Sequence, residues 1–258
     1  MKVGEAAQVR SNMIDFRVAD WSAWAPGLTT RDAWLAWAQA PTLPTGDGVP
    51  ELPEVPAMQR RRIERLGRMA VQVACWCEPD SPDNEAPLVF ASRHGDVARS
   101  LGLLEALVHG EPMSPTAFGL SVHNAIAALY SMARGHRGNY LALAAGSATV
   151  EAACMEAAGL LADGAPEVRI VVYDAPIPEI FSEFADEPTA FFAWCWRIVP
   201  LAGAGTRVSL RWGDQAPAAE PAPALLPRGL DMLRFLLAGD QPRTFVDTGA
   251  SWHWQCHG

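Results

Sequence analysis

The chain has 258 residues, enough for one large domain or two small ones with a buried core. Apolar residues make up 50% of it and charged residues 19%, which excludes a wholly disordered protein, because such chains lack the apolar surface that offsets the entropy of ordering. The 20 Lys and Arg against 29 Asp and Glu give a net charge of −9. A non-specific nucleic-acid binder needs cationic side chains against the phosphates, so this charge argues against that role.

Nothing in the sequence indicates a membrane span or an export signal. The longest apolar candidate, residues 141–165, is interrupted by Glu151 and Glu156. Residues 1–11 lack the apolar stretch of a secretory signal. The five cysteines are an odd number in a chain without such a signal, which favours a reduced protein. We therefore expect a cytoplasmic protein with no integral membrane segment.

The first third of the chain predicts a strand, a helix, a loop and a second helix. Alternating apolar residues predict a strand over 13–24, and Thr30 can cap a helix that runs through Trp37. Residues 41–56 hold five prolines and two glycines and predict a surface loop. Residues 59–77 predict the clearest helix, with an apolar stripe on one face and Arg61, Arg65 and Arg68 together on another.

Strands and helices alternate over residues 88–173. Strands are predicted over 88–92, 140–144 and 168–173, and helices over 96–108, 121–133 and 147–161. This alternation predicts βαβ units and a mainly parallel sheet covered on both faces. Two strands (191–199 and 206–212), a Pro/Ala-rich loop (215–224), a helix (225–238) and one or two short terminal strands (243–254) are then expected.

Two groups of residues could bind a metal by their chemistry, but for each we favour an interpretation without a metal. His253, Cys256 and His257 suit zinc by their chemistry, but three ligands this close together cannot easily converge from one strand, so we favour a frayed C-terminus. Cys75 and Cys77 have no partner pair elsewhere, and two buried or half-buried thiols are the favoured interpretation. We expect no metal and no cofactor.

A cluster of arginines forms a local positive patch in this acidic chain. Such a patch could steer an acidic partner, although a solvated helix face is the favoured interpretation. The cluster consists of Arg60, Arg61, Arg62, Arg65 and Arg68.

The most informative segment is 140–151, in which a strand runs through small residues into an Ala-rich helix. Many enzymes place a nucleophile at such a turn, because the helix N-terminus lowers the pKa of a thiol and stabilises an oxyanion. This turn has no cysteine. Ser147 lacks a general base at a recognisable spacing, so we favour a helix N-cap. The pair His123 and Asn124 lacks an orienting acid, and we favour a structural role in which it binds neighbouring backbone.

The run SPTAFGLSVHNA over 114–125 resembles the stretch that precedes the nucleophile in β-ketoacyl synthases. Residues 138–140 then enter the strand, and the sequence AAGS over 144–147 stands where those enzymes carry a Thr-Ala-Cys-Ser-type turn. The sequence WSAWAPG over 21–27 resembles the start of the short β-ketoacyl synthase-like N-terminal proteins, often called chain-length factors. The resemblance covers about residues 13–178.

The resemblance implies an α/β protein with the thiolase-like fold, which is built from two similar βαβαβ halves. This chain would hold mainly the first half and a shortened, irregular C-terminal part. We expect a ketosynthase-like domain over 12–212, with a loop, a helix and short terminal strands over 213–258 packed on it. Gly146 takes the position of the acyl-accepting cysteine, and the half that would bring two histidines has no counterpart. No catalytic residue carries over.

The family resemblance implies a heterodimer with a catalytically active ketosynthase, as in aryl polyene or xanthomonadin-type clusters related to polyketide and fatty-acid biosynthesis. An acyl carrier protein would meet the complex, with Arg61, Arg65 and Arg68 as candidate docking residues. The side chains expected near the partner's acyl tunnel are Met113, Phe118, His123 and Asn124. The strand expected to pair across the dimer axis consists of Asn139, Tyr140, Leu141, Ala142, Leu143 and Ala144.

Two other functions stay open at this point. One is a stand-alone homodimer that binds an acyl carrier or another hydrophobic ligand. The other is an acyl-transfer enzyme that uses Ser147 as its nucleophile together with His123.

Overall fold

The computed structural model describes residues 12–78, 85–213, 224–239, 241–247 and 250–257. Its first half contains β1 (Met13–Trp24), α1 (Arg31–Gln39), α2 (Ala57–Arg60), α3 (Arg65–Trp76), β2 (Leu88–Ala91), α4 (Val97–Val108), α5 (Pro115–Gly119), α6 (Ala125–Arg134) and β3 (Tyr140–Leu143). Then come the 3-10 turn η1 (Gly146–Ala148), α7 (Thr149–Ala162), β4 (Val168–Asp174), η2 (Glu179–Phe184), β5 (Phe192–Val199), β6 (Thr206–Gly213), α8 (Arg228–Ala238), β7 (Arg243–Asp247) and β8 (Ala250–His257).

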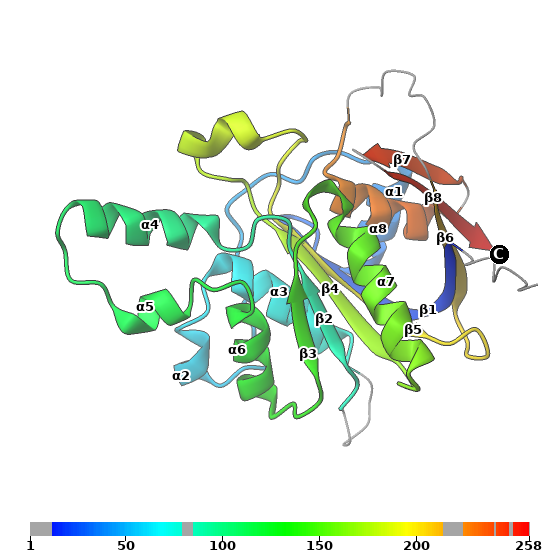
Figure 1. Ribbon diagram of the computed structural model, residues 1–258, viewed down its shortest axis with the longest axis horizontal. Coiled ribbons are helices and arrows are strands. Elements are labelled where there is room, and N and C mark those ends of the chain that lie inside the picture. Colours follow the sequence, from blue (N-terminus) through cyan, green and yellow to red (C-terminus); the bar gives the residue numbers. More distant parts are fainter. Residues whose placement is uncertain (1–11, 79–84, 214–223, 240, 248–249, 258) are drawn as a thin grey trace, which may run out of the picture.

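The strands form one mixed sheet in the order β3-β2-β4-β5-β1-β6-β8-β7 (Figure 1). β2 pairs in parallel with both β3 and β4, as the βαβ pattern predicts. The other neighbours in the sheet are antiparallel. The sheet is therefore parallel only at the end that contains β3, β2 and β4. Parallel neighbours need a crossover connection, usually a helix, whereas β5 follows β4 without one and runs antiparallel to it. The predicted α/β class is confirmed.

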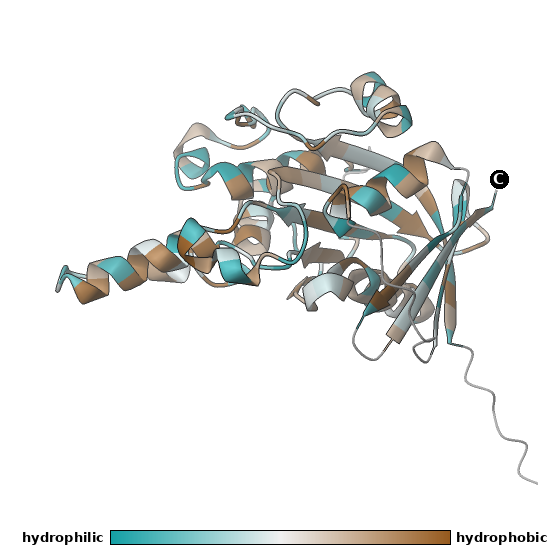
Figure 2. Ribbon diagram, turned by 90° about the horizontal axis from the view of Figure 1, so that it is seen from above, coloured by the Kyte–Doolittle hydropathy of each residue, from teal (hydrophilic) through white to brown (hydrophobic). Residues whose placement is uncertain are grey.

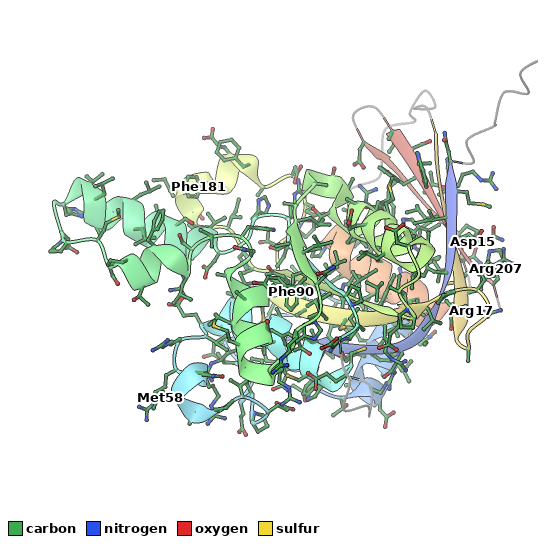
Figure 3. The ribbon with its side chains drawn as sticks, turned by 60° about the horizontal axis from the view of Figure 1, so that its bottom comes forward. Asp15, Arg17, Met58, Phe90, Phe181 and Arg207 are labelled. Atoms are coloured by element: carbon green, nitrogen blue, oxygen red, sulfur yellow. The ribbon has the colours of Figure 1, made fainter. Side chains whose placement is uncertain are left out.

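Helices cover both faces of the sheet, and each face has its own core. Ile170 and Val172 of β4 belong to the core beneath α1, α7 and α8, whereas Val171 and Tyr173 belong to the core beneath α3 and α6. This alternation follows from the two-residue period of a strand. Phe90 of β2 lies in the second core, with its ring centre 5.9 Å from that of Tyr130 on α6 (Figure 3). The result is a three-layer arrangement.

The C-terminal segment is more regular than the sequence suggests. β8 lies between β6 and β7, so the favoured frayed C-terminus is wrong. His253 Nδ1 lies 3.1 Å from Thr244 Oγ1, and His257 Nε2 lies 2.7 Å from Ser209 Oγ. Trp254 is 1% exposed, and its burial against the core explains why this alternating segment is ordered. Among the described residues, no group of three or more side chains is arranged to hold a metal ion.

The helix predicted over 59–77 is interrupted between α2 and α3. The guanidinium of Arg68 donates from Nε to the carbonyl oxygen of Ile63 at 3.0 Å, so it satisfies backbone that a continuous helix would have used. Ile63 is 3% exposed. The interruption buries that side chain, whereas the apolar stripe predicted for α3 faces the core as expected.

Helices α4 and α5 extend from the body as an arm, which we define as residues 97–122 (Figure 1). The apolar spacing correctly predicts the α4 helix, yet no residue of α4 is buried. Leu104, Leu107 and Val108 are 55%, 59% and 82% exposed. Figure 2 shows apolar residues along this projecting helix. No helix among the described residues has the length and apolar character needed to span a bilayer.

Candidate functional site: the turn after β3

The chain turns sharply between β3 and α7, and a glycine makes this turn possible. Gly146 has a φ of +57°, a left-handed conformation that costs other residues roughly 1–2 kcal/mol. The Thr149 hydroxyl accepts a hydrogen bond from the Ala145 N–H at 3.0 Å and donates one to the Gly146 carbonyl at 2.7 Å. Thr149 is a supporting residue that the sequence analysis missed.

The position of Gly146 is open. A Cβ built there meets no heavy atom within 4 Å, and residues 144–146 are exposed. None of the chain's cysteines lies in this turn. Burial raises the pKa of the Cys75 thiol to about 12 and that of Cys256 to about 11, and it raises the pKa of Cys154 as well. These are the surroundings of inert thiols rather than of an activated thiolate.

Ser147 lies inside the 3-10 turn and does not cap α7, so the expected N-cap role is wrong. The residue at the N-cap is Ala148, which forms no side-chain capping bond. The Ser147 hydroxyl instead donates to Asp247 Oδ1 at 2.7 Å. This bond ties the turn to β7, a strand that lies 100 residues further along the chain.

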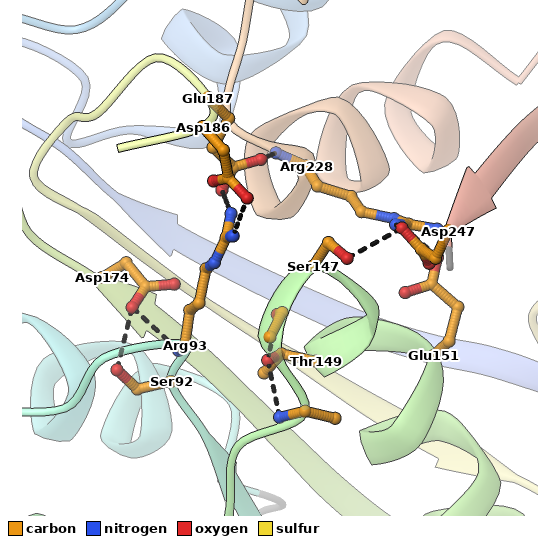
Figure 4. A network of polar contacts seen from close by, with 12 residues as sticks. Ser92, Arg93, Ser147, Thr149, Glu151, Asp174, Asp186, Glu187, Arg228 and Asp247 are labelled. Carbon is orange, nitrogen blue, oxygen red and sulfur yellow. Dashed lines mark hydrogen bonds and ion pairs between the residues drawn. The ribbon is translucent and has the colours of Figure 1, made fainter. Parts of the chain in front are cut away.

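Asp247 belongs to a polar network between α7, α8 and β7 (Figure 4). Both its carboxylate oxygens lie 2.8 Å from Arg228 Nη1, and Arg228 Nε lies 3.1 Å from Glu151 Oε1. Trp254 donates to the same Glu151 oxygen at 3.0 Å. Burial raises the pKa of Glu151, while Arg228 and the Trp254 N–H act in the opposite direction.

His123 and Ser147, the two residues of the acyl-transfer hypothesis, bind different groups. His123 Nε2 lies 2.9 Å from the carbonyl oxygen of Leu143 at the end of β3. That contact agrees with the structural role favoured from the sequence, and it ties the base of the arm to the turn. Asn124 is the N-cap residue of α6 and is exposed, and its side chain makes no capping bond.

β3 is the edge strand at the end of the sheet opposite β7, and no described strand pairs with its outer side (Figure 1). Leu88 N–H donates to Asn139 O at 3.0 Å and Ser92 N–H donates to Leu143 O at 3.2 Å. In parallel pairing this register directs the backbone of every second residue, including Leu141, toward β2. The backbone groups of Tyr140 and Ala142 therefore face outward. Exposed edges are usually protected by charge or proline, and β3 contains neither.

The other expected site residues lie apart from this turn. Met113 and Phe118 are on the arm and are 45% and 57% exposed. Arg61 is exposed. The Arg65 guanidinium lies 3.6 Å from the centre of the Phe191 ring, and Arg68 binds backbone carbonyls, so the arginines do not form one solvated face.

A second polar cluster lies where β2 and β4 end, and the sequence analysis did not identify it. Asp174 accepts hydrogen bonds from Ser92 Oγ at 2.8 Å and from the Arg93 N–H at 3.0 Å (Figure 4). Burial raises the pKa of Asp174 to about 7, and those two hydrogen bonds oppose the rise. A cleft of about 200 Å³ opens beside this edge, with His94 and Phe191 in its lining.

The family model of the β-ketoacyl synthase N-terminal domain matches residues 34–255. The chain belongs to this family. No curated protein matches its sequence. Among solved structures, it is similar to a chain of "Ketosynthase (ApeO) in Complex with its Chain Length Factor (ApeC)" from Xenorhabdus doucetiae. The TM-score is 0.76 at 26% identity, over 94% of this chain and 99% of that one.

Two further structures show the same fold. The ishigamide ketosynthase/chain length factor gives a TM-score of 0.70 at 13% identity and covers 93% of this chain and 98% of that one. A β-ketoacyl synthase from Burkholderia phymatum STM815 gives 0.56 at 13% identity over 80% of this chain but only 65% of that one. The chain thus has the thiolase-like ketosynthase fold, and its extent matches the first two structures better than the third.

Proposed function

We propose that this chain is a non-catalytic, chain-length-factor-like subunit that pairs with an active β-ketoacyl-carrier-protein synthase and shapes its acyl tunnel. The observation that carries the proposal is Gly146, which has a left-handed conformation in the turn between the edge strand β3 and α7. The sequence resemblance aligns this turn with the one that carries the nucleophile in β-ketoacyl synthases. The complex would elongate acyl chains of the polyene or fatty-acid type.

The absence of a nucleophile at the turn supports the non-catalytic part of the proposal. Glycine has no side chain that could attack a thioester. The neighbouring Ser147 hydroxyl donates a hydrogen bond to an Asp247 carboxylate that is already paired with Arg228, and His123 is hydrogen-bonded to backbone. Because a serine nucleophile needs an adjacent general base, the geometry favours this proposal over a Ser147-dependent acyl transfer.

The edge of β3 supports the pairing part of the proposal. No strand in the described part of the chain pairs with the outward backbone groups of Tyr140 and Ala142, and Leu141 is 36% exposed. A strand from a ketosynthase could continue the sheet here by β-augmentation. A structure at 26% identity is described as a ketosynthase in complex with its chain length factor, which is the kind of assembly proposed.

The arm supports the tunnel-shaping part of the proposal. Met113 and Phe118 are large, apolar and exposed, and the His123–Leu143 contact ties the end of the arm to the edge strand. A partner that covers β3 would therefore also approach these side chains. A carrier protein would meet the complex, and Arg61 is the candidate docking arginine with an exposed side chain.

Co-expression with a full-length ketosynthase, taken from a reading frame adjacent to this one where such a frame is present, tests the proposal. We expect the two chains to co-purify and their complex to extend acyl chains. This chain alone is expected to show no extension. The proposal fails if the chains never co-purify and extension is the same without this chain. Native mass spectrometry of the isolated chain provides the contrast, since a ligand-bound homodimer that ignores the ketosynthase would favour a stand-alone binding module.

A further inference from the structure

A ring of polar contacts starts and ends on the segment that follows Gly146 (Figure 4). Ser147 donates to Asp247, and Asp247 binds Arg228 through both carboxylate oxygens. Arg228 then binds Glu151, which is four residues after Ser147. Residues four apart share one face of a helical turn, so the ring closes on the start of α7 after passing through β7 and α8.

The turn itself has few contacts that could fix its shape. Residues 144–146 are exposed, and Gly146 has open space around it. Glycine also has more backbone freedom than any other residue, so its left-handed conformation has to be maintained by neighbours. Thr149 supplies local bonds, and the bond from Ser147 to Asp247 ties the turn to the distant strand β7.

Arg228 occupies a position that its charge does not favour by itself. It is the first residue of α8, where the helix dipole disfavours a cation. It is only 8% exposed, and its partner Glu151 is fully buried, so both groups have lost their hydration. Two carboxylates, Asp247 and Glu151, pair with the guanidinium. A third, Glu187, accepts a hydrogen bond from the Arg228 backbone N–H at the helix start, at 2.9 Å. When a charged residue is buried at a helix start that disfavours its charge, the position is often part of a functional site.

We infer that Arg228 is a positioning residue: through Asp247 and Ser147 it fixes the turn after β3, and so the edge with which the ketosynthase subunit pairs. The inference rests on the proposed function. The partner contacts the exposed backbone of β3 and of residues 144–146, while Arg228 itself stays inside the chain. Its effect on pairing is therefore indirect, and it passes through one hydrogen bond that can be removed alone.

Ser147→Ala removes that bond and leaves the contacts among Asp247, Arg228 and Glu151 in place. We expect the affinity for the co-expressed ketosynthase to fall about tenfold, because a turn without this tie has to be ordered when the partner binds. The melting temperature should fall by only a few degrees, since one hydrogen bond is lost from the folded chain, while amide hydrogen exchange at residues 144–148 becomes faster. Ser147→Thr keeps the hydroxyl and should restore both the affinity and the protection from exchange.

Two arginine variants separate positioning from general stability. Arg228→Met should weaken ketosynthase binding and speed exchange at the turn. Arg197→Met is the matched control, because it also removes a partly buried ion pair, the one between Arg197 and Glu167. This pair lies at the start of β4, the end of that strand away from the turn. The control should leave binding and exchange at the turn unchanged.

The results separate the inference about Arg228 from the proposed function of the chain. If the wild-type chain binds the ketosynthase and Ser147→Ala binds it equally well, the inference is overturned and the proposed function stands. Equal losses in Arg228→Met and Arg197→Met would also overturn it, because the cause would then be general destabilisation. If the wild-type chain does not bind the ketosynthase, the proposed function fails and the inference about pairing fails with it.

Discussion

A proline at position 142 tests whether the edge of β3 pairs with a ketosynthase. The register with β2 directs the backbone of Ala142 outward, so Ala142→Pro removes a donor from the free edge and leaves the bonds to β2 intact. Proline is tolerated on edge strands when its missing N–H faces away from the sheet. The folding stability of the isolated chain should therefore stay within about 1 kcal/mol of wild type.

The expected cost of this proline in the complex follows from the same geometry. Tyr140 and Ala142 offer backbone groups whose hydrogen bonds to a partner contribute roughly 1 kcal/mol each. Proline removes one bond and places its ring where the partner strand approaches. We expect a total loss of about 1.5–3 kcal/mol, or roughly 10- to 100-fold in the dissociation constant. Surface plasmon resonance with immobilised ketosynthase measures the change.

Two control variants make this result decisive. Ala142→Val keeps the N–H and suits a strand, so binding should be retained. Leu141→Pro removes an N–H that faces β2, so it should instead destabilise the isolated chain. Binding of Ala142→Pro within twofold of a wild-type chain that does bind would refute pairing through this edge.

Three further predictions concern the pH dependence of stability, the turn and the arm. Burial raises the pKa of Asp174 from 3.8 to about 7, so wild-type stability should fall as pH rises between those values. The fall is at most about 4 kcal/mol and smaller where water reaches this partly exposed residue. Asp174→Asn lacks this titration and should gain stability relative to wild type from pH 4 to 8 in urea unfolding. A difference that stays constant with pH would contradict the assignment. Gly146→Cys alone should give no condensing activity, because in the proposed complex the ketosynthase and not this chain supplies the histidine pair, and malonyl condensation by the isolated variant would contradict this. Phe118→Ala should shift the products of the complex toward longer chains in mass spectrometry. The shift should be graded, because an apolar wall rejects one more carbon unit by only ~1–3 kcal/mol. An unchanged distribution would remove Phe118 from the tunnel wall.

The β1 strand and the cap of α1 were predictable because their signals are local, whereas the cap predicted at Ser147 was not formed. The β1 strand has the predicted bounds, and Thr30 caps α1 by accepting a hydrogen bond from the Ala33 N–H. Both follow from patterns within a few residues. The same short range explains the error at the C-terminus. The sequence analysis of this segment rested on its histidines and cysteine and on its position at the chain end. Neither feature indicates that Trp254 is buried between the sheet and α8.

The arm and the turn show what local patterns leave out. The spacing of apolar residues in α4 correctly predicts a helix, but periodicity does not say whether this chain or another one covers the apolar side. The network that holds Ser147 joins residues up to 103 positions apart. A Glu within an Ala-rich helix and an Arg at a helix start were available as signals, because both charges sit where burial or the helix dipole disfavours them.

The exposed arm has a consequence for how the protein is produced. Apolar side chains such as Val108, at 82% exposed, lie on a projecting helix, and an unprotected strand edge lies at its base. Surfaces of this kind promote self-association when their partner is absent. A partner that binds only the folded chain stabilises it by mass action. The yield of intact protein should therefore depend on the stoichiometry of synthesis, with surplus chains aggregating and balanced production of both subunits keeping them in solution.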